Sequence, residues 1–326
     1  MVSLQVSRFG LVFPNPVIAG SSGLTGNIKS IKELARNGIG GIVLKSLFEE
    51  QILMEARREA SKGGVIYGQE EIDDYIGYYE KKHSLSEYLA LIRDAKHEVS
   101  VPVIASINCV SGGEWTEFAS DIQSAGADAL QLNIFGFRNS DPGSIVRAVK
   151  DKINIPLIAK IGYYFSDVSA VASVIEKAGA DALVLFNRPY SIDFDIEKLS
   201  LKQGAYFSSR EEMSVPLRWI SMLFGKVHAP IFASTGIHNG DDVVKMLLAG
   251  AAGTEVVSSL YRNSPEVIAQ MKARLESWME MHGFETIEAF RGLMSQTKSN
   301  TPETYERVQY MKYYGDLQER RDGVGN

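Results

Sequence analysis

Two lysines at the ends of short apolar segments are the residues of this 326-residue chain whose positions most suggest chemistry. Lys45 closes Gly-Ile-Val-Leu-Lys, and Lys160 closes Leu-Ile-Ala-Lys. A lysine at the end of a buried segment is costly unless its charge meets a partner. The pair therefore favours a bound anion or an electron-rich cofactor. A Schiff-base nucleophile and an outward-pointing side chain are the alternatives.

Asparagine ends three further apolar segments, at Asn108, Asn133 and Asn187. An amide offers both donors and acceptors, which suit a planar heterocycle carrying N–H and C=O groups. Serines stand at corresponding places near the start of the chain, at Ser21 and Ser22. These residue types predict a site for a flat, polar ring.

Small polar residues follow the last two apolar segments. One group contains Ser234, Thr235 and Gly236, and the other contains Ser258 and Ser259. Small side chains let backbone N–H groups approach an anion closely, and phosphate-binding barrels use the loops after their last two strands. We expect a phosphate site here, with two ordinary tight turns as the alternative. A ring site plus a phosphate site indicates flavin mononucleotide (FMN).

A repeat shows which elements position these residues. Ala-Gly-Ala-Asp-Ala-Leu occurs at 125–130 and 178–183, and each copy runs into an apolar stretch that ends in Asn. Looser copies stand at 36–46 and 248–258. Each copy is a helix end, a glycine stop and a short buried strand, which is half of a repeating βα unit.

Eight strands are predicted, at Val17–Ala19, Gly41–Lys45, Val103–Asn108, Ala129–Ile134, Leu157–Lys160, Ala182–Phe186, Ile231–Ser234 and Thr254–Val257. The helices predicted to follow them are Ile28–Asn37, Leu85–Val99, Trp115–Ala125, Pro142–Lys152, Ser166–Ala178, Ser214–Phe224, Asp241–Ala249 and Pro265–His282.

Eight βα units in one chain predict a TIM (β/α)₈ barrel, which typically takes about 250 residues. A doubly wound sheet of eight parallel strands is the alternative. In a barrel, chemistry takes place at the carboxyl ends of the strands, where the polar residues above fall. The long segments 46–84 and 187–214 also follow strand ends, so we expect them to form lids or walls over that mouth.

Composition narrows the class of protein. A net charge of −6 gives no reason to expect a nucleic-acid partner. The single cysteine, Cys109, excludes an internal disulfide and a multi-cysteine metal centre built from this chain alone. The five histidines lack metal-ligand spacing, so no metal site is expected. Neither a signal peptide nor an apolar membrane span is recognisable, which favours a cytoplasmic location.

In order and spacing these motifs resemble the dihydroorotate dehydrogenase family over about residues 10–292. Phe-Pro-Asn-Pro-Val-Ile-Ala-Gly-Ser-Ser-Gly (13–23) is similar to the family's first strand and flavin-contacting turn. Gly-Ile-Val-Leu-Lys-Ser (41–46), Leu-Gln-Leu-Asn (130–133), Ile-Ala-Lys-Ile (158–161) and Leu-Phe-Asn (185–187) are similar to later family strands. Ser-Thr-Gly-Ile (234–237) and Val-Ser-Ser-Leu (257–260) stand where the family holds the FMN phosphate, and 283–292 resembles its closing helix.

The resemblance implies an FMN-dependent oxidation of dihydroorotate to orotate, in pyrimidine and UMP biosynthesis. It implies catalytic or substrate-contacting roles for Lys45, Asn133 and Asn187. Its implied cofactor contacts are Ser21, Ser22, Lys45, Asn108, Asn133, Lys160, Ser234, Thr235, Gly236, Ser258 and Ser259. The flavin carries the redox chemistry, and the protein supplies orientation and charge.

The substrate half of the pattern differs from the family. The family's base is a Cys or Ser three residues after the strand-four asparagine, and Gly136 stands there, which cannot take a proton. The second asparagine is displaced to Asn139, and the 70–79 loop departs as well. Candidate replacements are Cys109, Tyr163, Tyr164, Asp73 and Asp74, and Arg138 is a candidate carboxylate clamp.

Three functions therefore stay open. The chain is a dihydroorotate dehydrogenase with an unusual base, a flavin oxidoreductase of the same fold with another CH–CH substrate, or a flavin-holding subunit without substrate chemistry. We expect an FMN-binding barrel over 1–292 and a helical tail over 293–326, which contains a helix start at Thr301-Pro302-Glu303. The expected assembly is a homodimer that acts on a small molecule.

Overall fold

The structure is a computed structural model that describes residues 2–48, 85–109, 116, 118–134, 141–189 and 191–307. Eight parallel strands form its centre: β3 (Val17–Ala19), β4 (Gly41–Val43), β6 (Val103–Cys109), β7 (Ala129–Ile134), β8 (Leu157–Ile161), β9 (Ala182–Leu185), β12 (Ile231–Ser234) and β13 (Gly253–Val256).

These strands close into a ring. Each pairs in parallel with its neighbours in the order β4-β3-β13-β12-β9-β8-β7-β6, and β6 pairs back to β4. An open doubly wound sheet would leave two unpaired edges, so that alternative is wrong and the TIM barrel is confirmed. A short extra strand, β5 (Leu47–Phe48), adds to β6 beyond the end of β4.

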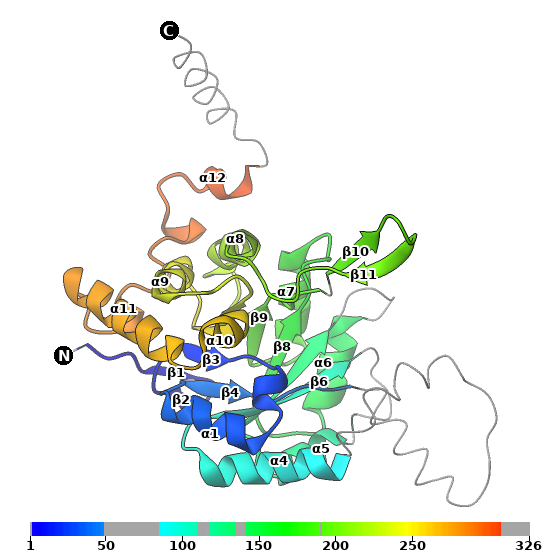
Figure 1. Cartoon of the computed structure of the whole chain (residues 1–326). Coiled ribbons are helices and arrows are strands. Elements are labelled where there is room, and N and C mark those ends of the chain that lie inside the picture. Colours follow the sequence, from blue (N-terminus) through cyan, green and yellow to red (C-terminus); the bar gives the residue numbers. More distant parts are fainter. Residues whose placement is uncertain are drawn as a thin grey trace, which may run out of the picture.

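Helices lie around the outside of the ring (Figure 1). They are α1 (Ile28–Arg36), α4 (Leu85–Glu98), α5 (Phe118–Ser124), α6 (Pro142–Lys150), α7 (Val168–Lys177), α8 (Ser214–Leu223), α9 (Gly240–Ala249), α10 (Ser258–Asn263) and α11 (Val267–Met281). Two helices begin with a side-chain cap: Asp167 accepts from Ala170 N at the start of α7, and Asn239 accepts from Asp242 N at the start of α9. The predicted strand and helix bounds differ from the observed ones by no more than three residues, and three strands have the predicted bounds.

The core is the apolar filling of the ring and of the layer between the ring and its helices. The residues of β3, β4, β7, β8, β9, β12 and β13 are all buried, as expected for strands covered on both faces. A short hairpin of β1 (Val6–Arg8) and β2 (Leu11–Phe13), which the sequence did not predict, adds Phe9 and Phe13. Both rings pack against Phe232 of β12, with centroids 5.9 Å away.

The long segment after β9 contains a second hairpin that was not predicted. It pairs β10 (Ile192–Asp195) with β11 (Ser200–Gln203) and projects from the barrel (Figure 1). The segment continues through a single 3₁₀ turn, η3 (Glu211–Met213), into α8. Residues 49–84 of the other long segment lie outside the described residues.

The prediction of a closing helix over 283–292 is wrong. The structure has only the 3₁₀ turn η4 (Ile287–Ala289) there, because the chain turns back over the end of α11 to bury Phe290. Trp278 packs against Phe284 and Phe290, at centroid distances of 5.7 and 5.0 Å. Further on lie η5 (Gln296–Lys298) and α12 (Glu303–Glu306), which begins at the predicted place. Within the described residues, no helix is long and apolar enough to cross a bilayer.

Candidate functional site

A cavity of about 330 Å³ opens at the carboxyl ends of the strands. Its volume lies in the range of about 300–1,000 Å³ that is usual for small-molecule sites. The sequence-predicted site residues that line it are Ser21, Lys160, Asn187, Ser234, Thr235, Gly236 and Ser258. They come from five strands, so barrel closure gathers residues that are far apart in the sequence.

Lys160 lies in this cavity beside a residue that the sequence analysis missed. Lys160 Nζ donates to Glu255 Oε2 at 2.6 Å, and both side chains are over 90% buried. Gln131 Nε2 of β7 donates to the second oxygen, Glu255 Oε1. Lys160 therefore has a charge partner within the chain itself, whereas the sequence led us to expect a bound anion or an electron-rich cofactor.

Asn133 belongs to a polar network next to the cavity. Its Nδ2 lies 3.0 Å from Ser106 Oγ and 3.1 Å from Ser46 Oγ. Ser46 Oγ in turn lies 2.9 Å from Ser21 Oγ, and Ser46 N donates to the same Ser21 oxygen. This network ties the ends of β3, β4, β6 and β7 together, and it fixes the amide of Asn133 within the strand ends.

The predicted phosphate loops meet at a cluster of hydroxyls. Ser258 Oγ accepts hydrogen bonds from Ser208 N at 3.0 Å and from Ser208 Oγ at 3.1 Å. With both contacts accepted, the Ser258 proton is available to a ligand. Ser208 was not predicted, because its contacts depend on how the segment after β9 folds back.

His238 also contacts this cluster of hydroxyls. Its Nε2 lies 3.2 Å from Ser208 Oγ, which donates its own proton to Ser258 and so accepts from the imidazole. Burial, and then the nearby Arg262, lower the pKa of His238 below its ordinary value. The ring is therefore neutral near pH 7, with its proton on Nε2.

The turn after β12 is held in an unusual conformation. Thr235 and Gly236 both have positive φ, at 83° and 78°. A Cβ on Gly236 would lie 2.3 Å from the backbone nitrogen of Met213, so only glycine fits there. Thr235 Oγ1 donates to Phe186 O at 3.2 Å, which ties the turn to the end of β9. Strain of this kind gathers where the surrounding structure fixes a loop for a ligand.

The segment after β9 forms one wall of the cavity, as expected. Arg188 holds it in place: its guanidinium donates to Glu212 Oε2 at 2.8 Å and to the carbonyls of Ala205 and Tyr206. Arg188, Gln203 and Tyr206 line the cavity next to Asn187.

Five predicted residues do not line the cavity: Asn133, whose network is described above, and four others. Lys45 and Asn108 lie half-buried at the carboxyl ends of β4 and β6, and Lys45 passes over Gly26. Ser22 is half-buried after β3. Ser259 is fully buried, and its Oγ has no hydrogen-bond partner among the described residues. Their predicted contacts with a cofactor stay predictions.

The structure describes only some of the candidate bases and of the other residues expected to face the substrate. Gly136, Arg138, Asn139, Asp73 and Asp74 lie outside the described residues, and Cys109 is the last residue of β6. Tyr163 and Tyr164 follow β8 with their ring centroids 4.5 Å apart. Burial, and then the contact with Tyr163, raise the pKa of Tyr164 to about 12. Tyr164 is therefore a poor proton acceptor near pH 7.

The donor set of the cavity fits FMN. Its lining includes hydroxyls and the tight turn after β12, which suit a phosphate, and the Lys160 ammonium, which suits an electron-rich ring. The buried, unpartnered Ser259 Oγ adjoins Ser258 in the chain. Among the described residues there is no group of acidic, histidine or cysteine side chains that would hold a metal ion.

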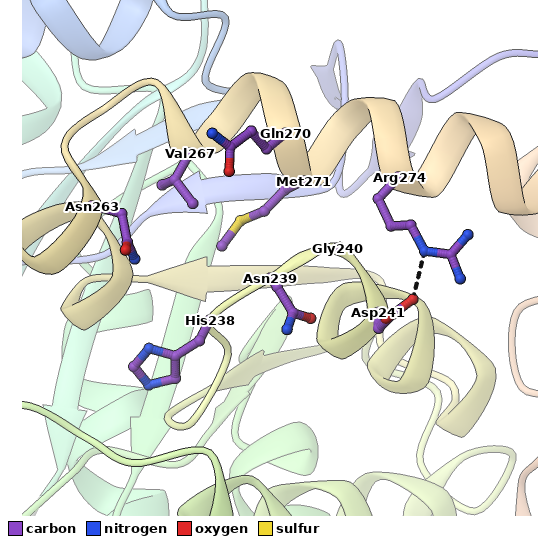
Figure 2. Close-up of a pocket in the computed structure, with 9 residues that line it drawn as sticks. All are labelled: His238, Asn239, Gly240, Asp241, Asn263, Val267, Gln270, Met271 and Arg274. Atoms are coloured by element: carbon purple, nitrogen blue, oxygen red, sulfur yellow. Dashed lines mark hydrogen bonds and ion pairs between the residues drawn. The ribbon is translucent and has the colours of Figure 1, made fainter.

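A second pocket lies between the start of α9, which follows the first predicted phosphate loop, and the helix α11 (Figure 2). It measures about 420 Å³, and its lining includes His238, Asn239 and Met271. Asp241 and Arg274 close one end through a 2.7 Å ion pair. None of the residues predicted from the sequence lines it, so the cavity at the strand ends is the candidate active site.

Comparison with known proteins agrees with this geometry. The family model described as "Dihydroorotate dehydrogenase" matches residues 3–279. A protein of Pyrococcus abyssi named "Dihydroorotate dehydrogenase B (NAD(+)), catalytic subunit" is 28% identical over 89% of this chain and 98% of its own length.

A protein of Aeropyrum pernix named "Putative dihydroorotate dehydrogenase A (fumarate)" is 30% identical over 62% of this chain and 70% of its own length. The family match spans every strand of the barrel. The chain belongs to the dihydroorotate dehydrogenase family, and it is an FMN flavoprotein oxidoreductase that acts on CH–CH bonds.

Proposed function

We propose that this chain oxidises a CH–CH bond of a small, flat substrate held against FMN in the cavity at the strand ends, with dihydroorotate as a poor substrate. The observation that carries the proposal is the cavity itself, which places Lys160, Asn187 and Ser258 around one space. When bound, FMN supplies the acceptor for two electrons.

The proposed roles of the cofactor-binding residues follow their positions. Ser234, Thr235, Gly236, Ser258 and Ser259 hold the phosphate. Lys160 places its ammonium at the electron-rich edge of the flavin, where positive charge stabilises a reduced, anionic ring. The remaining contacts, on the strand ends β3, β4, β6 and β7, come from Ser21, Ser22, Lys45, Asn108 and Asn133.

Substrate handling is proposed for Lys45, Asn133 and Asn187. Asn187 lines the cavity, and the amide of Asn133 is fixed by Ser46 and Ser106. Fixed amides orient a ring by its N–H and C=O groups. Lys45 stands between flavin and substrate in this arrangement.

Gly136 is the reason to expect slow oxidation of dihydroorotate. A positioned base contributes roughly 10²–10⁴-fold to such a reaction, and glycine has no group that takes a proton. Another CH–CH substrate whose proton leaves to a different residue is the second candidate. A flavin-holding subunit without its own chemistry is the third.

The purified protein tests these functions in order. We expect a yellow protein with about one FMN per chain, and a protein that stays colourless with added FMN would refute the proposal. Anaerobic addition of dihydroorotate then separates the first candidate from the other two: slow bleaching supports the first, no bleaching supports the second or third, and fast bleaching contradicts the role given to Gly136.

For assembly we propose a cytoplasmic homodimer. The support is the β10–β11 hairpin, in which Ile192, Phe194 and Leu201 share one face and are 60–73% exposed. Apolar patches of this kind mark protein contacts. Light scattering should give the mass of two chains, and Phe194→Lys should give that of one. A monomeric wild-type protein would refute this part.

A further inference from the structure

Glu255 is a buried charge for which the proposed function gives no role. It lies in β13, and its carboxylate meets Lys160 Nζ of β8 at 2.6 Å and Gln131 Nε2 of β7. Among the described residues, Lys160, Asp242 and Glu255 are the buried ones that carry charge. Asp242 serves a different purpose, since it accepts from backbone nitrogens at the start of α9 and pairs with Arg210.

Stability alone does not account for this pair. Burying two charges costs desolvation energy, and replacing such a pair with apolar side chains is often neutral or stabilising. Moreover, the pair is not sealed below the cavity, because Lys160 and Glu255 both line it. Whatever occupies the cavity therefore meets both charges together.

The two charges oppose each other's effect on an occupant. An ammonium alone stabilises added negative charge on a nearby ring, and a carboxylate 2.6 Å from that ammonium offsets much of this effect. The offset is large in a site from which water is excluded. Glu255 also fixes the position of Lys160 Nζ, since the carboxylate is itself held by Gln131.

We propose that Glu255 is a positioning residue that holds Lys160 and lowers the reduction potential of the bound flavin relative to what Lys160 alone would set. This inference rests on the proposed site, because it requires the flavin to lie against Lys160. It adds that Lys160, Glu255 and Gln131 act as one unit whose net charge is zero.

The test is the two-electron reduction potential of bound FMN, measured against reference dyes in the loaded protein. Glu255→Gln removes the charge and keeps the shape. Its new amide N–H can donate to Gln131 Oε1, which has no partner among the described residues. We expect the equilibrium for reduction to rise at least tenfold, which is about 30 mV for a two-electron couple.

Two further variants separate charge from structure. Glu276→Gln, on the exposed face of α11, removes the same charge far from the cavity and should leave the potential unchanged. The double variant Gln131→Glu/Glu255→Gln exchanges acid and amide across one hydrogen bond. It should return the potential toward the wild-type value, which a purely structural role for Glu255 would not require.

Each outcome decides the matter. A rise in Glu255→Gln that the exchange reverses supports the inference, and an unchanged or lower potential in Glu255→Gln overturns it. If Glu255→Gln fails to hold FMN, Gln131→Glu is measured instead; the added carboxylate should lower the potential, and no change overturns the inference. A wild-type protein that takes up no FMN refutes the proposed function, whereas a yellow protein with an insensitive potential refutes only the role of Glu255.

Discussion

Lys160 Nζ and Glu255 Oε2 lie 2.6 Å apart although β8 and β13 are separated by two other strands of the ring. The contact therefore crosses the interior of the barrel at its carboxyl end. It places a paired ammonium in the cavity that we assign to FMN. Removing Lys160 should therefore have different consequences from removing Glu255.

Lys160→Ala should lower both the affinity for FMN and its reduction potential, because the ammonium that favours the reduced ring is lost. The variant also leaves Glu255 buried without its partner, so we expect it to lose about 3–5 kcal/mol of stability. Urea unfolding and FMN titration measure the two effects separately.

The double variant Lys160→Ala/Glu255→Gln is the control for that experiment. It should recover much of the stability, since no unpaired charge stays buried, while the affinity for FMN stays low. If Lys160→Ala alters neither affinity nor potential, Lys160 does not face the flavin.

Gly236→Ala should disturb the phosphate loop. The new Cβ would meet the backbone of Met213 at a positive φ, so the turn must shift. Gly10→Ala is the matched control, because Gly10 has a φ of 81° and no atom within 4 Å of an added Cβ. We expect Gly10→Ala to lose about 1–2 kcal/mol of folding stability from backbone strain. Gly236→Ala should lose about 1–3 kcal/mol more.

Affinity for FMN distinguishes these two variants further. Only Gly236→Ala should weaken it, because Gly10 lies in the β1–β2 hairpin. Equal affinities in the two variants would show that the loop after β12 does not hold the cofactor.

His238 should make stability depend on pH. Its folded-state pKa is lowered, chiefly by burial, so the unfolded chain binds a proton at a higher pH than the folded protein does. The contribution of His238 to stability is therefore fully present above about pH 6.5, which is its pKa in the unfolded chain, and it is lost as the pH decreases below that value. In His238→Gln this part of the decline should be absent, as measured by urea unfolding between pH 7 and 5. Identical pH profiles would contradict the buried, neutral imidazole.

The barrel could be predicted because its signals are local. Each strand is a short apolar run that begins after a glycine stop or a proline, so the strands Val17–Ala19, Ala129–Ile134 and Ile231–Ser234 have the predicted bounds. The β10–β11 hairpin could not be predicted in this way. Its apolar side chains are exposed rather than buried, so its strands lack the signal of a buried apolar run.

The residues of the candidate site could likewise be predicted only where the local sequence carries a signal. Lys160 and the loop around Gly236 stand at strand ends, where residue type and position in the repeat indicate chemistry. Glu255 was missed because a glutamate inside Gly-Thr-Glu-Val carries no signal of its own, and its partner lies 95 residues earlier in the chain. Ser208 was missed for the same reason, since the fold alone brings it to Ser258.

Anaerobic mixing of the FMN-loaded protein with dihydroorotate tests the account most directly, with the flavin absorbance followed in time for the wild type and for Gly136→Cys. Both proteins should be yellow. We predict that the wild-type flavin is bleached slowly or not at all, and that the cysteine variant, which restores a proton acceptor, is bleached roughly 10²–10⁴-fold faster. Rapid bleaching of the wild-type flavin, at a rate that Gly136→Cys does not increase, would contradict the account.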